Sequence, residues 1–487
     1  MIMNKKPKLS AKTNTEITQL LERYVKGVID LDVEINRRYK AGENLFDGLD
    51  LAIGAAFGTE KDFNHRSVTK QTEQLLIDAC NLILDKTELR ARIGFSNLFK
   101  NMKEELGKEV LYSDYKKKSM HRVLENTLFR LLEKVEKNAL FVFPIIYTRN
   151  AEKMRFDFGP LAFMDMYSFL SDDVAAKLMT NKDEVDDRFE DSYGNAWEAV
   201  KERAKHVVTV HLQGYELEKG KVAARSAVEF FLNVLRLSFK WDGELKIKVL
   251  DHNIQETMTP SFILLEDGKF SRSLYGASSE YIFLKDGASI EAIEALADYH
   301  HVLSSIIDGI VRNSSSRSVV LQKIEYASFL IKTAFQQDSV RIALVNFVSA
   351  LESLACLSSQ SKKADLSKRC RLVGLGTSET DREKISKAVY NAYNHRNNVV
   401  HGNAFDEDKY WRVFRDLEEW MLYLFLAYID LLTHIEFSKQ PKSGKKLRKA
   451  LQEHFVKIDS VPSSTISIIG SSLIRLLKFP CLRNPFT

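Results

Sequence analysis

The feature that most constrains the fold of this chain is the run WMLYLFLAYIDLLTHI, residues 420–435. If this run forms a helix, the helix is apolar on every side. Such a helix must be covered all round by protein or by lipid. A membrane span needs about 18 to 20 apolar residues, whereas this run has sixteen and includes Asp430. We therefore expect no stable membrane insertion and place the run inside a helical bundle. The sequence leaves open whether a second copy of the chain covers this run or the chain's own helices enclose it.

Helical periodicity surrounds this run. From residue 301 onward, apolar residues recur at three- and four-residue steps and predict helices over 301–312, 320–336, 340–357, 364–373, 381–401 and 407–436. Asp338 and Ser339 are candidates to cap the third of these helices, and Thr380 with Glu383 fits the capping box of the fifth. The same periodicity predicts helices in 15–40 and 68–138, with a Gly-rich loop over 48–67 between them.

The pattern changes near residue 139. Segment 139–163 predicts two short strands joined by a turn at 149–153, and β-branched runs predict further strands in 205–221 and 244–253. Between those runs, 223–239 predicts an amphipathic helix. The expected fold class is mainly α with a smaller α+β middle part and a C-terminal helical bundle. The expected domains are an N-terminal helical region, a mixed α+β domain, a helical bundle and a basic C-terminal tail, over 1–138, 139–300, 301–436 and 437–487.

Charge and cysteine usage narrow the class of protein. The net charge is only +5, but residues 437–487 carry ten Lys/Arg against two Asp/Glu. A basic tail favours a polyanion or an acidic surface as partner, with a solubilising role as the alternative. The four cysteines form no CxxC pair and have no His at ligand spacing, so we expect no metal, no cofactor and no secreted disulfide scaffold. No apolar run follows the basic N-terminus, which predicts a cytoplasmic protein without a signal peptide.

The segment TDREKISKAVYNAYNHRNNVVHGN, residues 380–403, carries the candidate chemistry. Arg396 falls on an apolar stripe that runs through Ile385, Val389, Ala392 and Val399. An arginine directed at a bundle interior is costly unless it is paired or faces a cavity. Nothing in the folding pattern requires a charge at this position, and a functional cleft would explain it.

Two further residues accompany Arg396 at the end of this helix. His401 follows it by five residues, about 140° round an ideal helix, while Asn397 and His401 share a face. Gly402 is placed to be the left-handed residue that ends the helix, and unwinding of the last turn would let guanidinium and imidazole meet. Histidine serves as a general acid or base near neutral pH, and arginine grips phosphate with two hydrogen bonds. Because RNA supplies its own 2′-hydroxyl nucleophile, this group suits metal-independent RNA cleavage.

The motif RNNVVHG resembles the R-x4-6-H signature of the HEPN superfamily, and the preceding FVSALESLACL helix resembles the Apea-like branch. The resemblance covers about residues 301–436. It implies a helical bundle that dimerises so that two motifs face each other across a cleft. It also implies ribonuclease activity, commonly in toxins and anti-phage abortive-infection systems. On this sequence it implies that Arg396 and His401 are catalytic, that Asn397 is the polar residue after the arginine, and that Glu352 is an acid that orients the site.

Other interpretations of these residues are open. Glu352 is able to pair with Arg396, or equally with Arg369 or Arg371. Arg396 and His401 also fit structural roles, bonded to helix-end carbonyls and exposed at a cap. The basic segment 361–371 is a candidate RNA-backbone track, with a solvated helix face as the alternative. Its candidate RNA-binding residues are Lys362, Lys363, Lys368, Arg369 and Arg371.

The function of the whole chain has two interpretations. In the first, the chain is a dimeric ribonuclease that acts in anti-phage defence. In the second, it is a non-catalytic dimer of the same type that binds RNA or a protein partner as a scaffold or sensor. Residues 1–300 would sense a trigger, for example one derived from phage, restrain the nuclease or present its target. The RNA target is open between tRNA, rRNA and mRNA.

Overall fold

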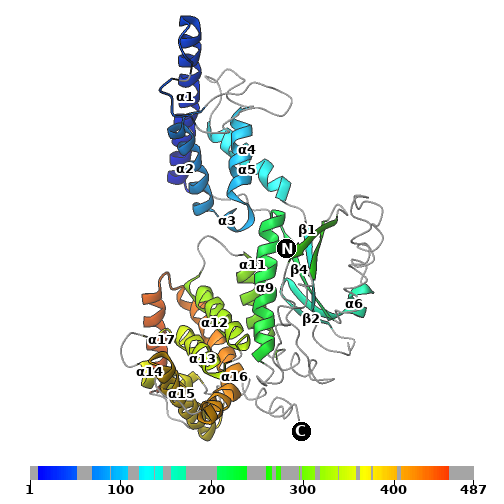
Figure 1. The fold of residues 1–487 in the computed structure, drawn as a ribbon, viewed down its shortest axis with the longest axis vertical. Coiled ribbons are helices and arrows are strands. Elements are labelled where there is room, and N and C mark those ends of the chain that lie inside the picture. Colours follow the sequence, from blue (N-terminus) through cyan, green and yellow to red (C-terminus); the bar gives the residue numbers. More distant parts are fainter. Residues whose placement is uncertain are drawn as a thin grey trace. The chain divides into compact units, whose positions relative to one another are not determined.

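The computed structural model consists mainly of helices, with one sheet in the middle of the sequence (Figure 1). The residues that it describes are 9–45, 47–51, 68–87, 89–107, 120–135, 138–145, 155–171, 206–237, 259–265, 270–275, 296, 299–312, 318–337, 339–357, 362–373, 377–402 and 407–459. The chain divides into two units: unit 1 holds 1–139, 212–223 and 312–316, and unit 2 holds the rest. The expected fold class, mainly α with a smaller α+β part, is confirmed.

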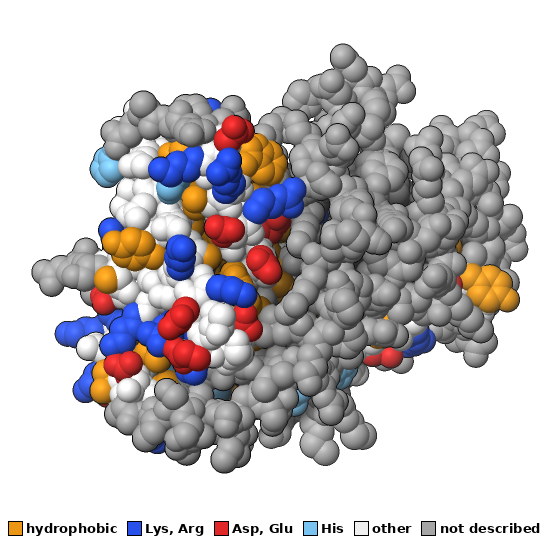
Figure 2. Space-filling model, turned by 90° about the horizontal axis from the view of Figure 1, so that it is seen from below, with side chains coloured by type: hydrophobic (Ala, Val, Ile, Leu, Met, Phe, Trp, Pro, Cys, Tyr) orange, Lys and Arg blue, Asp and Glu red, His pale blue; other side chains and the backbone are white. Residues whose placement is uncertain are grey.

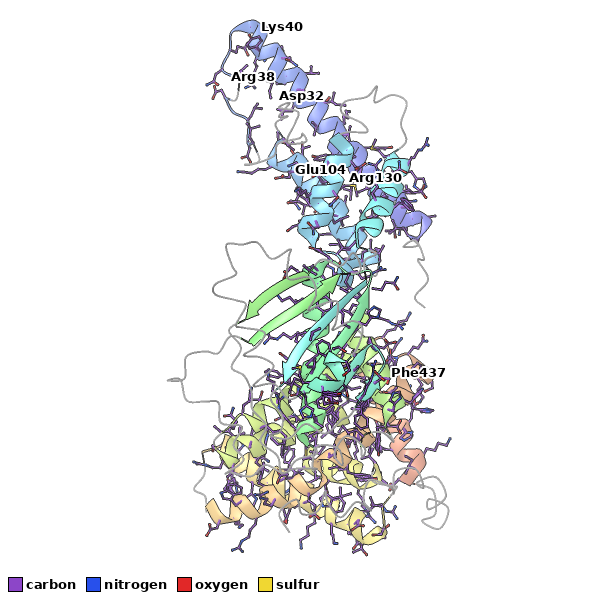
Figure 3. All side chains as sticks on the ribbon, turned by 90° about the vertical axis from the view of Figure 1, so that its right-hand side faces the viewer. Asp32, Arg38, Lys40, Glu104, Arg130 and Phe437 are labelled. Atoms are coloured by element: carbon purple, nitrogen blue, oxygen red, sulfur yellow. The ribbon has the colours of Figure 1, made fainter. Side chains whose placement is uncertain are left out.

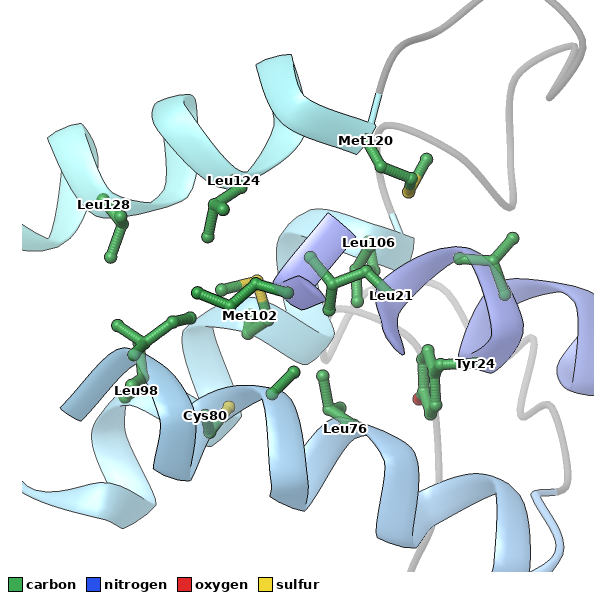
Figure 4. Packing of buried hydrophobic residues seen from close by; sticks show 14 of the residues in the cluster. Leu21, Tyr24, Leu76, Cys80, Leu98, Met102, Leu106, Met120, Leu124 and Leu128 are labelled. Atoms are coloured by element: carbon green, nitrogen blue, oxygen red, sulfur yellow. The ribbon is translucent and has the colours of Figure 1, made fainter. Parts of the chain in front are cut away.

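Unit 1 is a helical assembly with its own apolar core. Its helices are α1 (Ala11–Ala41), α2 (Lys70–Lys86), α3 (Leu89–Arg92), α4 (Phe95–Leu106) and α5 (Met120–Val135). Figure 4 shows the apolar faces of α1, α2, α4 and α5 directed into a common interior. Leu21, Leu76 and Leu124 are among the side chains that fill it. Burial of these faces, more than helix propensity, stabilises the helices.

The starts of α1 and α2 are set by hydroxyl caps. The side chains of Ser10 and Thr69 accept the amide N–H groups of Thr13 and Thr72, each at 3.1 Å. Serine and threonine are favoured at this position because they satisfy a helix-end donor that has no partner within the helix. The last turns of α1 extend past the core, where Figure 3 labels Asp32, Arg38 and Lys40.

Helices α1 and α2 approach closely at Gly27. A Cβ placed there would lie 2.7 Å from the hydroxyl oxygen of Thr72 and 2.9 Å from its methyl carbon. Gly27→Ala is therefore expected to destabilise unit 1 by about 1–3 kcal/mol through overpacking, although alanine is the better helix former. Faster amide hydrogen exchange in α1 and α2 would measure this loss. Adding Thr72→Ala should restore the protection of these amides against exchange. If Gly27→Ala lowers protection equally with and without the Thr72 side chain, the close contact is contradicted.

Segment 212–223 belongs to unit 1 although it follows the middle strands. The carboxylate of Glu216 accepts the amide N–H of Gly94 at 2.6 Å and also bonds to the side chain of Asn97, so it caps α4. Beside it, Arg92 donates to the carbonyl oxygen of Gly214 at 2.6 Å. A negative charge is stabilising at a helix N-terminus. Residues 122 positions apart in the sequence thus complete unit 1.

Unit 2 begins with the sheet. Its strands are β1 (Asn138–Ile145), β2 (Arg155–Phe158), β3 (Leu161–Asp165), β4 (His206–Gln213), β5 (Thr259–Leu265) and β6 (Phe270–Tyr275), in the order β2-β3-β4-β1-β5-β6. β3 pairs antiparallel with both β2 and β4, and β5 pairs antiparallel with β6. The sequence predicted only two strands in 139–163, whereas three form there. The run at 244–253 and the turn at 149–153 lie outside the described residues.

Helix α9 (Leu217–Leu237) joins the sheet to the helices that follow. Its Phe231 packs against the rings of Phe158 and Phe163 at centroid distances of 5.2 and 5.6 Å. On the side of the bundle, Asn233 donates to the hydroxyl of Ser328 at 3.0 Å. Sheet and bundle therefore share one unit, where the sequence suggested a boundary at 300. The short helix α6 (Met166–Leu170) follows β3 directly.

The C-terminal bundle contains the helices predicted from residue 301 onward. They are α11 (His300–Arg312), α12 (Val319–Phe335), α13 (Val340–Ala355), α14 (Lys362–Val373), α15 (Glu379–Val400), α16 (Glu407–Lys439) and α17 (Gly444–Asp459). Helix α16 packs against α12, α13, α14, α15 and α17. The apolar run 420–435 is thereby enclosed by the chain's own helices, apart from exposed positions such as Asp430. The run consequently gives no argument for a second subunit.

By length and composition alone, α16 over Asp408–Lys439 would suffice to cross a membrane, and it is the one such helix among the described residues. Most of it is buried inside the bundle, as is usual for a core helix of a soluble protein. The segment from 460 onward, the end of the expected basic tail, lies outside the described residues.

Two features of the bundle differ from the sequence expectations. Helix α16 continues past 436, and α17, assigned by charge to a tail, packs on the bundle through Leu447, Ala450, Leu451 and Phe455. At the start of α15 the cap is Ser378, which accepts the amide N–H of Asp381 at 3.2 Å, instead of Thr380. Ser339 does precede α13, but its side chain forms no capping hydrogen bond.

Candidate functional site

Helix α15 presents the three residues of the candidate motif at its C-terminal end. Ile385, Val389 and Ala392 of its apolar stripe are buried as predicted, whereas Val399 near the end of the helix is only half-buried. The helix stays regular to its end, because the amide of His401 still donates to the carbonyl oxygen of Asn397 at 2.9 Å. Gly402 follows with φ +67°, the left-handed conformation expected of it. The predicted unwinding of the last turn does not occur.

Arg396 lies at the edge of the core, and its side chain is 24% exposed. One guanidinium nitrogen lies 3.5 Å from a carboxylate oxygen of Glu352, and another donates to the side-chain oxygen of Asn397 at 3.1 Å. The guanidinium carbon lies 5.6 Å from the ring centroid of Tyr393. Its Nε has no hydrogen-bond partner among the described residues. Glu352 and Asn397 therefore orient the guanidinium, and because Nε is itself buried, the exposed part of the side chain lies at its other atoms.

Glu352, in the last turn of α13, connects the site to two other helices. Its side chain is 15% exposed, and it accepts the hydroxyl of Tyr393 at 3.1 Å. The ammonium of Lys362, at the start of α14, lies 3.9 Å away. Of the three arginines that the sequence left open as partners, the structure selects Arg396. Burial and then the Glu352 carboxylate raise the pKa of the Tyr393 hydroxyl, which keeps it a donor at neutral pH.

His401 lies apart from this group. Its side chain is exposed at the end of α15. Within the described part of the chain, no hydrogen bond or ion pair links its imidazole to Arg396, Asn397 or Glu352. The structure thus brings Arg396, Asn397 and Glu352 together and leaves His401 on the neighbouring surface, one helical turn beyond Asn397.

The five basic residues proposed for α14 point in several directions and all have partners. Besides Lys362, the ammonium of Lys363 lies 4.3 Å from the ring centroid of Tyr390. Arg369 donates to the carbonyl oxygen of Ala355 at 2.6 Å, which caps the end of α13. Two exposed ion pairs complete the set, Lys368–Asp459 and Arg371–Glu379.

These partners reduce the case for a continuous basic track on α14. Figure 2 views the molecule from the end that carries the bundle and shows Lys and Arg side chains interspersed with Asp and Glu. Lys362 and Lys363 are the two that lie at the candidate site. Exposed ion pairs are weak and exchange readily with a phosphate ligand, whereas the half-buried Arg369 is committed to the fold through its bond to Ala355.

Sequence reasoning missed Tyr393 and Tyr390. A usable signal existed for Tyr393, because it precedes Arg396 by three residues and so shares its side of the helix. No comparable signal marked Tyr390, whose relation to Lys363 depends on how α14 packs on α15. Among the described residues, no group of three or more His, Cys, Asp or Glu side chains is placed to hold a metal ion.

No family model, no curated protein and no solved structure matches this chain.

Proposed function

We propose that the chain is a metal-independent endoribonuclease of the HEPN type, which acts as a toxin-like effector in anti-phage defence. One observation carries the proposal. A partly exposed guanidinium on the apolar stripe of α15 is oriented by Glu352 and Asn397, and an exposed imidazole, His401, stands at the end of the same helix. Phosphate binding beside a general acid or base is the chemistry that this arrangement supports.

In the proposed reaction His401 takes the proton of a ribose 2′-hydroxyl, and the oxygen attacks the adjoining phosphorus. The bond from phosphorus to the 5′-oxygen of the next nucleotide breaks, and that oxygen takes up a proton from an imidazolium. The products are a 2′,3′-cyclic phosphate and a 5′-hydroxyl. Arg396 binds the phosphate oxygens and stabilises the charge that builds up on them. Glu352 and Asn397 act as positioning residues for Arg396.

The proposal includes a homodimer through the bundle, in which two copies of the motif face one cleft. Since Arg396 and His401 do not meet within one protomer, a second copy would supply an imidazole opposite each guanidinium. We place the protein in the cytoplasm, where cellular RNA and a phage-derived trigger would both be available. The described residues outside the bundle are assigned to sensing or restraint.

The proposal is tested by RNA cleavage without divalent metal. Purified protein is expected to cut RNA in EDTA, and cells that express it under phage challenge should accumulate discrete new 5′-hydroxyl ends in total-RNA sequencing. The sequences at those ends would show whether tRNA, rRNA or mRNA is the target. Intact RNA under every activating condition, from protein that is folded in solution, would exclude the nuclease.

A non-catalytic dimeric scaffold or sensor is the second candidate. It is favoured by the contact that commits Arg369 of α14 within the chain and by the lack of a side-chain link between His401 and Arg396 in the described structure. Growth separates the two functions. A nuclease arrests cells when triggered and loses this effect when its motif is replaced, whereas a scaffold affects growth equally with and without the motif.

A further inference from the structure

The exposed face of α15 carries an aromatic ring that the fold does not need. Tyr390 is 40% exposed, and the core stripe of this helix is already supplied by Ile385, Val389 and Ala392. No hydrogen bond is formed by the Tyr390 hydroxyl within the described chain, and Tyr390 does not contribute to the apolar interior. Burial in the core therefore does not account for a large aromatic side chain at this position.

Tyr390 lies on the same face of α15 as Asn397 and His401, while Arg396 lies about 120° round the helix from Tyr390. Asn394, Asn397 and His401 follow it by four, seven and eleven residues, which places all four within about 60° of arc on a regular helix. The face runs about 10 Å from Tyr390 to Asn397 and about 16 Å to His401. It consists of an aromatic ring, two amides and an imidazole, a composition suited to a polar ligand with flat apolar groups.

Cations flank the aromatic end of this face. The ammonium of Lys363 lies 4.3 Å from the centroid of the Tyr390 ring, and Lys362 next to it shares the Glu352 carboxylate with Arg396. Aromatic rings beside lysine and arginine are the features with which proteins bind single-stranded nucleic acid, because bases stack on the ring while cations hold the backbone. Base-paired RNA would not offer a free base face to the ring.

We propose that Tyr390 is a stacking platform for an unpaired base, and that the substrate of the site is single-stranded RNA. This inference rests on the proposed function and specifies its substrate class. The stacked base lies on Tyr390 and Lys363 contacts its backbone. The adjoining strand runs along Asn394 towards Arg396 and Asn397, where the scissile phosphate binds. Tyr390 selects and positions the substrate and takes no part in proton transfer.

The test uses the full-length protein and a labelled 2′-O-methyl oligoribonucleotide, which has no free 2′-hydroxyl and so is not cut. In fluorescence anisotropy the single strand is expected to bind more tightly than the same sequence in a duplex. Tyr390→Ala should weaken single-strand binding roughly 5- to 150-fold, while Tyr390→Phe, which keeps the ring, should retain most of the affinity. Lys363→Ala should weaken binding and lower the log–log salt slope by about one.

Tyr326→Ala is the matched control, because Tyr326 is 54% exposed on α12, a helix that supplies no residue to the site. It should leave the affinity unchanged. Equal binding of single strand and duplex, or equal binding by wild type and Tyr390→Ala, would overturn the platform. Binding that depends on Tyr390, in a protein that cuts no unmodified RNA, would retain the platform and reject the nuclease. RNA cleavage that is unchanged in Tyr390→Ala would retain the nuclease and reject the platform.

Discussion

Replacing Arg396 by alanine is expected to lower the rate of RNA cleavage about 100- to 1000-fold, because the guanidinium that stabilises charge on the phosphate is lost. That factor corresponds to about 2.7–4 kcal/mol of transition-state free energy. His401→Ala should lose a similar or larger factor, about 100- to 10,000-fold, as expected for a general acid or base. The double variant should be little worse than the poorer single variant, since residues of one catalytic unit are not additive. Rates of fragment formation under single-turnover conditions measure all three.

The structure supplies controls for this experiment. Arg396→Ala leaves the Glu352 carboxylate with Tyr393 and Lys362, so some loss of stability is expected and each rate must be normalised to folded protein. Arg382→Ala is the matched variant, because Arg382 is also largely buried on α15 and paired with a glutamate, but lies at the other end of the helix. It should leave the normalised rate unchanged. Normal cleavage by Arg396→Ala with a lowered unfolding temperature would make the arginine purely structural.

The second large effect concerns the sheet at low pH. His206 on β4 is fully buried, its backbone is in register with Asp165, and its ring stacks on Phe163 at 5.4 Å between centroids. Burial lowers the pKa of His206 to about 4, and the Asp165 charge offsets only part of this. In the unfolded chain this histidine has its ordinary pKa near 6.5. Between about pH 6.5 and 4, the ring therefore binds a proton in the unfolded chain but stays neutral in the folded protein.

This difference makes the fold less stable as the pH falls from about 6.5 towards about 4. Above pH 6.5 the ring is neutral in both states, and its full contribution to the free energy of unfolding is present. Below pH 6.5 the unfolded state binds the proton and is stabilised relative to the folded state. The loss is about 2 kcal/mol at pH 5 and about 3 kcal/mol near pH 4. His206→Phe should abolish this part of the pH dependence in unfolding midpoints measured from pH 7 to 4.5. His211→Gln, exposed on the same strand, should keep it, and equal pH profiles for wild type and His206→Phe would contradict the assignment.

The helices of the bundle were predictable because each repeats its buried positions at three- and four-residue steps. Arg396 was recognised as exceptional for the same reason, since it stands on such a stripe. Its partner was not predictable, because Glu352 lies on another helix and the sequence offered it three arginines, Arg369, Arg371 and Arg396. Likewise, the charges of α14 looked free in the sequence, although their partners Asp459 and Glu379 are brought in by the packing of α17 and α15.

The sheet and α17 show where local patterns fail. Strand β1 lies between β4 and β5, and a pairing of remote segments leaves no trace in the periodicity of either. In α17 the lysines dominated the interpretation and concealed Leu447, Leu451 and Phe455, which recur at four-residue steps and are buried. Net charge describes the solvent face of such a helix, while the spacing of its few apolar residues determines whether it packs.

The contact between Glu216 and α4 also sets an order of events during translation. The chain is synthesised from its N-terminus, so α1 to α5 leave the ribosome well before residue 212. At roughly 5–20 residues per second, the 122 positions between Gly94 and Glu216 take on the order of ten seconds to add. Until then the start of α4 lacks the carboxylate that caps it. Unit 1 thus cannot finish folding on the nascent chain until the end of β4 and the start of α9 have emerged.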